Sequence, residues 1–225
     1  EYRVFENDSY RNLMPQIILS ELKPMTIADV MKARLEAVNS NDPVGKEFWL
    51  YHDVSTSDGV AFEREFDYRD GGKMKVVRDA KALKDIKPDT ELSMFGTLAL
   101  TQKQYRALEG QEFTRERLGA IHPLSKKEIK SHPLWLALAG GDTYLLSEYT
   151  DAIFAEMKHK TLNIQLGSFD ENAHIRPLYV DHLLMDDHIN GWRSLADKTR
   201  LIGLGDGGER QEPQESLDKK VLEFK

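Results

Sequence analysis

Apolar residues recur with helical spacing in two stretches of the chain. The first follows Thr26, a residue type that caps helices, and its apolar positions are Ile27, Val30, Met31, Leu35 and Val38. The second follows Asp142 and contains Leu145, Leu146, Tyr149, Ala152, Ile153 and Met157. Residues three and four positions apart lie on one face of a helix. Both stretches are therefore predicted to be amphipathic helices that pack one face on the core.

Shorter helices are predicted from the residues that begin or end them. A proline is tolerated in the first turn, so a helix is expected over 15–22. A threonine cap and a following glycine indicate a helix over 101–108. Ser125 with Glu128 has the spacing of a capping box, and a further helix over 133–139 ends at a glycine pair.

The clearest strand pattern lies in residues 62–77. Aromatic residues alternate with acids in its first half, and apolar residues alternate with lysines in its second half. Only a three-residue loop at 70–72 keeps the two faces separate. The pattern therefore predicts a hairpin whose cross-strand pairs are Tyr68 with Met74, Phe66 with Val76 and Asp67 with Lys75. We interpret its charged face as a solvated sheet face rather than a binding surface.

Other stretches are predicted to be extended. The apolar run at 48–51 is followed by the turn-forming residues of 55–59, which favours a short strand and then a turn. Further strands are expected over 92–100 and 162–166. The stretch 175–189 fits either a strand or a helix.

These elements predict an α+β fold. A small antiparallel sheet built on the 62–77 hairpin would lie in the N-terminal half, and the C-terminal half would be mainly helical. We expect one domain over 1–204, with a mixed lobe at 1–100 and a helical lobe at 101–204. Residues 205–225 are predicted to be a polar linker and a docking tail.

Composition limits the classes of function. The 225 residues carry a formal net charge of −7 with acids and bases interspersed, which argues against nucleic acid as a partner. The longest apolar stretch, at 134–139, is far shorter than the roughly 20 residues that cross a bilayer, so no membrane association is expected. The absence of cysteine favours the cytoplasm or an assembled particle, and a first residue other than Met leaves secretion open.

One group of residues has the composition of a metal site. His174, His182, Asp186 and His188 lie close together in sequence, and imidazole with carboxylate suits zinc, manganese or iron(II). Their spacing matches no motif with a known mechanism. The alternative is that the acids are exposed and the histidines are surface or hydrogen-bonded core groups. No catalytic residue and no cofactor are predicted, apart from a divalent transition metal in this alternative.

The C-terminal segment divides into two parts. Residues 205–216 are almost free of apolar side chains, whereas the last residues form an apolar stripe with helical spacing, made of Leu217, Val221, Leu222 and Phe224. Such a stripe can bind a neighbouring chain or fold back onto its own core.

Two hypotheses of function follow from these observations. The preferred one is a non-enzymatic subunit or adaptor of a larger assembly, such as a virion or another multi-protein machine. It would bind a protein partner, or associate with itself, through residues 205–225. The alternative is a metal-dependent hydrolase or oxygenase that uses the 174–188 cluster.

Overall fold

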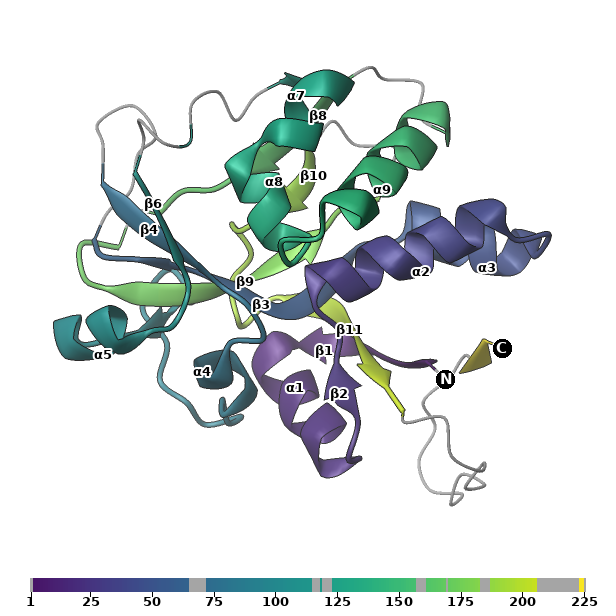
Figure 1. Ribbon diagram of the computed structural model, residues 1–225. Helices are drawn as coiled ribbons and strands as arrows, with labels where there is room; N and C mark the ends of the chain where they lie inside the picture. Colours follow the sequence, from purple (N-terminus) through teal and green to yellow (C-terminus); the bar gives the residue numbers. More distant parts are fainter. Residues whose placement is uncertain are drawn as a thin grey trace, which may run out of the picture.

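A computed structural model describes most of the chain (Figure 1). The described residues are 2–64, 72–114, 118, 123–156, 161–168, 170–182, 187–205 and 223–224. The predicted hairpin residues Phe66, Asp67 and Tyr68 lie outside these ranges, as do most residues of the tail.

Most helices begin at residues that cap them. The described helices are α1 (Tyr10–Leu19), α2 (Ile27–Asn39), α3 (Pro43–Tyr51), α4 (Lys81–Lys84), α5 (Gln102–Ala107), α7 (Lys126–Ser131), α8 (Pro133–Leu138) and α9 (Thr143–Glu156). Thr26 caps α2 and Thr101 caps α5, as the sequence predicts, and in the structure each of them closes a reciprocal capping box. The helices expected over 101–108 and 133–139 are also confirmed. In the described ranges, no helix combines the length and the apolar character needed to span a bilayer.

The strands join into one mixed sheet that uses residues from the whole chain. They are β1 (Tyr2–Ser9), β2 (Lys23–Pro24), β3 (Val54–Phe62), β4 (Lys73–Val77), β5 (Leu98–Ala99), β6 (Gln111–Thr114), β7 (Leu124–Ser125), β8 (Thr161–Gln165), β9 (His174–Val180), β10 (Asp187–Asn190), β11 (Lys198–Leu204) and β12 (Glu223–Phe224). The main order is β12-β1-β11-β3-β9-β10-β8-β7, and β4 extends β3 toward β6. The β11–β3 and β10–β8 pairs are parallel, and the other pairs are antiparallel.

Helices cover both faces of this sheet. Helices α2, α3, α7, α8 and α9 lie on one side, and α1 and α4 lie on the other (Figure 1). Alternate residues of each strand therefore enter different cores. In β3, Val60 and Phe62 join the larger core while Ala61 joins the smaller one. In β11, Ile202 and Leu201 divide in the same way.

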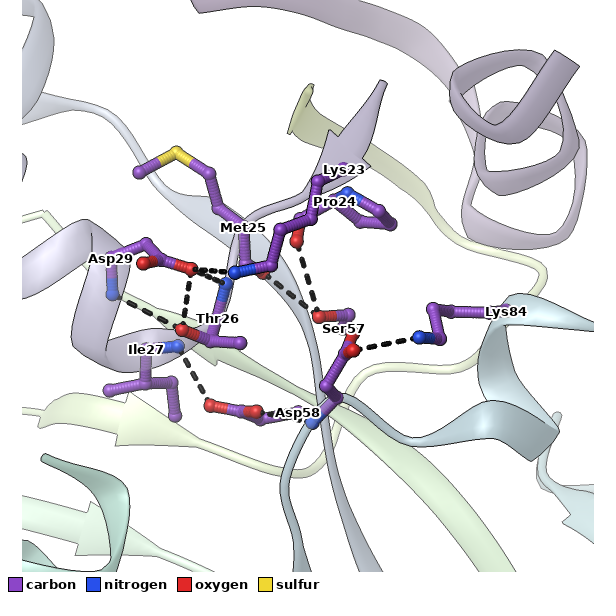
Figure 2. Close-up of polar contacts among 10 residues, drawn as sticks. Lys23, Pro24, Met25, Thr26, Ile27, Asp29, Ser57, Asp58 and Lys84 are labelled. Carbon is purple, nitrogen blue, oxygen red and sulfur yellow. Dashed lines mark hydrogen bonds and ion pairs between the residues drawn. The ribbon is translucent and has the colours of Figure 1, made fainter. Parts of the chain in front are cut away.

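A bulge in β3 lets this strand change neighbours. Its first residues lie beside β11 and its last residues pair with β4, and the register to β9 shifts between Ser55 and Gly59. Backbone groups that leave the ladder there need other partners. The buried Asp58 carboxylate accepts the Ile27 N–H at 2.8 Å (Figure 2). It also accepts the Asp79 N–H at 2.8 Å, so it joins the start of α2 and the end of β4 to the bulge.

The bulge also ties β2 to the sheet. The Ser57 N–H donates to the Met25 carbonyl at 2.8 Å, and the Ala80 N–H donates to the Ser57 carbonyl at 2.8 Å. Figure 2 shows Ser57 directed at the Pro24–Met25 segment, while Thr26 and Asp29 form the cap of α2 beside it. The polar side chains of this central strand therefore form hydrogen bonds with backbone groups of neighbouring segments.

The predicted fold class is wrong in its proportions. The sheet is large and mixed rather than a small antiparallel one, and the C-terminal half contributes six strands, from β6 to β11, between residues 101 and 204. The coarser description as a protein of helices and strands holds. The prediction failed because β9, β10 and β11 are short or buried strands with no clear alternation, and their partners lie far away in sequence.

The predicted hairpin register is also wrong. Val76 pairs with Val60 rather than with Phe66, and Met74 pairs with Phe62 rather than with Tyr68. Lys75 lies opposite Ala61 of β3 and not opposite Asp67, and it is not exposed. Its Nζ donates to the carbonyls of Tyr105, Arg106 and Leu108 at 3.1 to 3.3 Å, and the residue is only 9% exposed. The cation satisfies carbonyl groups at the C-terminal end of α5, a tertiary role that the strand pattern does not encode.

The structure of segment 43–62 differs from the predicted strand and turn. The apolar run at 48–51 belongs to helix α3, and the residues at 55–59 lie inside strand β3. Asp42 caps α3 by accepting the Val44 N–H at 3.0 Å, with Pro43 in the first turn. The strand expected over 92–100 is reduced to β5, and the first helix spans 10–19 rather than 15–22. The strand expected over 162–166 is confirmed as β8.

Candidate functional site

His174, the first residue of the predicted metal cluster, is a hydrogen-bonded core residue. It is 1% exposed at the start of β9. Its Nδ1 lies 2.7 Å from the Asn172 carbonyl, and its Nε2 lies 2.5 Å from the Ser168 hydroxyl. The carbonyl can only accept, so Nδ1 carries the proton and Nε2 accepts from Ser168. Both ring nitrogens are thus used within the fold.

The structure does not bring His174 and His182 together. His174 begins β9 and His182 lies two residues beyond its end, and the six steps along the strand, at about 3.3 Å each, span roughly 20 Å. Asp186 lies outside the described residues, and the side chain of His188 is not described. Among the side chains that are described, no three potential metal ligands converge. The remaining metal prediction, Asp186 with His188, therefore concerns groups beyond the described structure.

Ser168 and His174 have the contact of a nucleophile and its base, but not the access. Ser168 is 2% exposed, and its hydroxyl also accepts the Asp170 N–H at 3.2 Å. Burial lowers the pKa of His174, which keeps the ring neutral. A substrate cannot reach the hydroxyl in this arrangement, so the pair stabilises the loop before β9.

The C-terminal stripe is described only at its end. Leu217, Val221 and Leu222 lie outside the described residues. Phe224 belongs to β12, which pairs antiparallel with β1 of the same chain, Tyr2 with Phe224 and Arg3 with Glu223. The end of the tail thus lies on the sheet of its own chain.

An open cleft of about 370 Å³ lies where β1, the α3–β3 junction, the end of β9 and the start of β11 meet. Side chains from four distant parts of the sequence line it. They are Glu6, Asn7, Tyr51, His52, Asp53, His182, Arg193, Lys198, Thr199 and Arg200. Of these residues, only His182 was predicted from the sequence to belong to a site.

Asp53 fixes one wall of this cleft. One carboxylate oxygen accepts the His182 N–H at 2.9 Å, and the other lies 2.5 Å from Arg193 Nη2. The Arg193 guanidinium also lies over the Tyr179 ring at 4.3 Å. Burial alone would lower the pKa of Arg193, but the hydrogen bond and charge of Asp53 raise it above its usual value. Arg193 is therefore charged and held in place.

Arg200 and Glu6 form a second ion pair in the lining of the cleft. Glu6 Oε2 lies 2.8 Å from Arg200 Nε and 2.6 Å from Arg200 Nη2, and the guanidinium lies over the Phe48 ring at 5.4 Å. His52 also stacks against the Phe48 ring, with centroids 5.5 Å apart. Next to Glu6, β1 bulges at Asn7, whose φ of 69° bends the strand at the edge of the cleft.

The residues that line the cleft carry one more positive than negative charge. They include three cations, Arg193, Lys198 and Arg200, and two carboxylates, each of which is paired with an arginine. The buried Asp181, which does not line the cleft, also acts electrostatically on Arg193. Lys198 is exposed and has no ion pair within the described part of the chain. The Nδ1 atom of His182 is buried and has no hydrogen-bond partner among the described residues. In a protein with a net charge of −7, this cleft offers donors to an anion.

No short motif could have revealed this cleft. Its lining residues are far apart in the sequence. Arg200 and Glu6, for example, are 194 positions apart, although Arg200 Nε lies 2.8 Å from Glu6 Oε2. The available signal was a weak one: Asp53 follows an apolar run and Arg193 follows a tryptophan, and neither position matched a motif with an assigned role. Such pairs become visible only once the sheet order is known.

Comparisons with known proteins bear on the fold. No family model matches the chain, and no curated protein matches it. Among solved structures, the chain is similar to a protein with the C-type lectin fold, a fold reported to accommodate massive sequence variation in Nanoarchaeota. The TM-score is 0.67 with 10% sequence identity, and the match covers 91% of this chain and 98% of that chain. At this identity the likeness shows the fold alone.

Proposed function

We propose that this protein is a non-enzymatic binding subunit that recognises an acidic segment of a partner protein in the cleft around Asp53 and Arg193. The observation that carries the proposal is the charge of the cleft. Both of its carboxylates are neutralised by fixed arginines, while Lys198 stays exposed and unpaired by any described carboxylate. A carboxylate-bearing ligand would supply the missing charge.

The paired arginines support recognition in a second way. Each is held by a carboxylate and by an aromatic ring, so little side-chain entropy is lost when a ligand binds. Preorganised donors give specificity at a small cost in ordering. The ion pairs remain a quarter exposed, with the side chains of Arg193 and Asp53 at 29% and 24%. Their outer N–H groups can therefore reach a ligand.

The fold is compatible with a binding role and does not define the ligand. The structural neighbour shows that the C-type lectin fold accommodates massive sequence variation, so one backbone can present very different surfaces. Function must then be argued from the side chains of the site. A catalytic role has less support, because the one described pair with the geometry of a nucleophile and a base, Ser168 and His174, is buried.

Binding of a short oligoglutamate peptide, measured by isothermal titration, tests this proposal. We expect weak binding that falls with added salt, because the contacts are partly exposed. The Lys198→Glu variant should bind about tenfold more weakly, since a charge reversal at the rim changes the binding free energy by about 1.4 kcal/mol. An oligolysine peptide should not bind.

Lys127→Glu is the matched control. It makes the same charge change on α7, where Lys127 is exposed and away from the cleft. It should leave the affinity within about twofold, because charges beyond a Debye length of roughly 8 Å are screened. Equal losses in the two variants would show that net charge rather than the cleft attracts the peptide. Absence of binding by the wild-type protein at low salt would remove the proposal.

A further inference from the structure

Strand β1 is paired along its full length on one side only. It pairs with β11 from Tyr2 to Ser9. On its outer side it pairs with β12 at Tyr2 and Arg3, and no other described strand lies there. A strand edge with free N–H and C=O groups is a template for another chain, and folded proteins usually cover it.

The chain can cover this edge without strain. Tyr2 lies between Leu204 on the inner side and Phe224 on the outer side, so the two ends of the 205–222 segment are only about 10 Å apart, or two strand spacings. Eighteen residues can span several times that distance. A tether of this length gives the tail a millimolar effective concentration at its own sheet. At micromolar protein, pairing within the chain therefore outcompetes pairing between chains.

We propose that β12 caps the β1 edge of its own chain, and that the uncovered edge pairs with β1 of a second copy. The cap would thus prevent self-association rather than cause it. The sequence-based hypothesis, in which residues 205–225 bind a neighbouring chain, makes the opposite prediction for loss of the tail. The inference does not rest on the proposed function, because it concerns the outer backbone edge of β1, whereas Glu6 takes part in the cleft through its side-chain ion pair with Arg200.

The exposed part of β1 fits a second copy of itself. Two antiparallel copies related by a two-fold axis through the sheet place Val4 opposite Val4 and Arg3 opposite Phe5, with side chains on matching faces. Residues 2–6 contain one arginine and one glutamate, so two copies do not repel each other. The bulge at Asn7 ends the straight part of the edge, which limits the contact to about five residues. The resulting dimer should be weak.

Engineered disulfides in the full-length protein test the cap. The chain has no cysteine, so a Tyr2→Cys, Phe224→Cys variant and an Arg3→Cys, Glu223→Cys variant each contain a single pair. Adjacent antiparallel pairs alternate between two geometries, so one of the two variants has the closer backbones that suit a bridge. On a non-reducing gel we expect an intrachain bridge in a monomer. A disulfide-linked dimer, or no bridge in either variant, would overturn the cap.

Full-length variants with a disrupted cap test the uncovered edge. Proline at both positions of β12, Glu223→Pro with Phe224→Pro, removes the strand's donors. The matched control places the same two prolines at Gln211 and Gln214, outside β12. By analytical ultracentrifugation we expect the first variant to dimerise about tenfold more tightly than the control and the wild-type protein.

A third variant shows which surface the dimer uses. Arg3→Glu gives the 2–6 strand two negative charges and none positive, so two copies repel when it is added to the β12 proline variant. The dimer should then be lost. A dimer that persists would mean that another surface associates, and an uncapped protein that stays monomeric would refute the edge pairing.

Discussion

At the residue scale, Asp58 is the most costly and most informative side chain. It is fully buried, and burial raises its pKa to about 6 although two backbone N–H groups and Arg78 favour the charged form. The charged or titratable groups around it are Arg78 and Asp79 at the end of β4 and Tyr10 at the start of α1. The fold accepts this cost because the carboxylate satisfies two backbone donors, the first N–H of α2 at Ile27 and the N–H of Asp79 just after β4.

Asp58 should make the protein less stable as pH rises from 4 to 7. Its pKa is higher in the folded chain than its ordinary value of 3.8, so the folded state binds the proton more tightly. Stability is then fully present below pH 4 and is lost as pH passes 6, by roughly 3 kcal/mol for a shift of about two pH units. Urea unfolding of the wild-type protein and of Asp58→Asn at a series of pH values measures this.

The comparison between these two proteins isolates the residue. At pH 4 the asparagine variant should be the less stable of the two proteins. Its side-chain oxygen can accept one of the two backbone N–H groups, but its NH2 group is a donor and cannot accept the other. That difference should shrink as pH rises, since only the wild-type protein loses stability from this site. A difference that stays constant from pH 4 to pH 7 would contradict a raised pKa for Asp58.

At the element scale, single side chains fix where helices start and stop. Thr26 accepts the Asp29 N–H at 3.2 Å, and Asp29 accepts the Thr26 N–H at 3.0 Å, which closes the box at the start of α2 (Figure 2). Burial would raise the pKa of Asp29, but its hydrogen bonds with Thr26 and the charge of Lys23 lower it. The cap also aims the N–H of Ile27 at Asp58.

Thr26→Ala should lower the free energy of unfolding by about 1 to 2 kcal/mol, because it removes the acceptor for one orphan N–H of α2. Thr26→Ser keeps the hydroxyl, so it should lower the free energy of unfolding by only about a third of that amount. Urea titration followed by circular dichroism measures both variants. Equal losses in the two would mean that the threonine methyl group, and not the cap, stabilises this helix start.

Lys75 has the corresponding role at the end of α5. Lys75→Met should lower the free energy of unfolding by about 2 kcal/mol, because three carbonyls lose a charged donor. Lys73→Met is the control on the same strand, where the exposed ion pair with Glu112 at 3.4 Å is worth at most about 1 kcal/mol. A larger loss in the control than in Lys75→Met would refute the assigned role.

At the scale of the whole molecule, the sheet order creates both sites. Strand β11, near the end of the described chain, lies between β1 and β3. Because β11 pairs with β1, Arg200 of β11 lies beside Glu6 of β1. Further along the chain, β12 pairs with the other edge of β1. The peptide-binding test and the edge-pairing test therefore examine two consequences of one topology.

Helices with local signals could be predicted from the sequence, and those without could not. Thr26, Thr101 and the Ser125–Glu128 pair each mark a helix start within four residues, and all three starts are observed. The start of α3 carried the same kind of signal in Asp42 and Pro43, but its apolar run was interpreted as a strand. A short apolar run has no period that separates the two structures.

The candidate site was beyond sequence reasoning for a different reason. The 174–188 cluster drew attention because its residues are neighbours in sequence, yet β9 is extended and carries His174 and His182 apart. The residues that do meet, such as Asp53 and Arg193, are 140 positions apart. Nothing in either segment indicates the other.

Local patterns and composition were sufficient to predict the capped helices, the apolar stripe of α9 and the net negative charge, because each depends on residues a few positions apart or on composition alone. The folded structure was needed for the extent of the sheet, the use of Asp58 and Lys75 as buried partners, and the charged cleft. Those features depend on which strands become neighbours. Strand pairing is a long-range choice, made when buried backbone groups find partners across the whole chain.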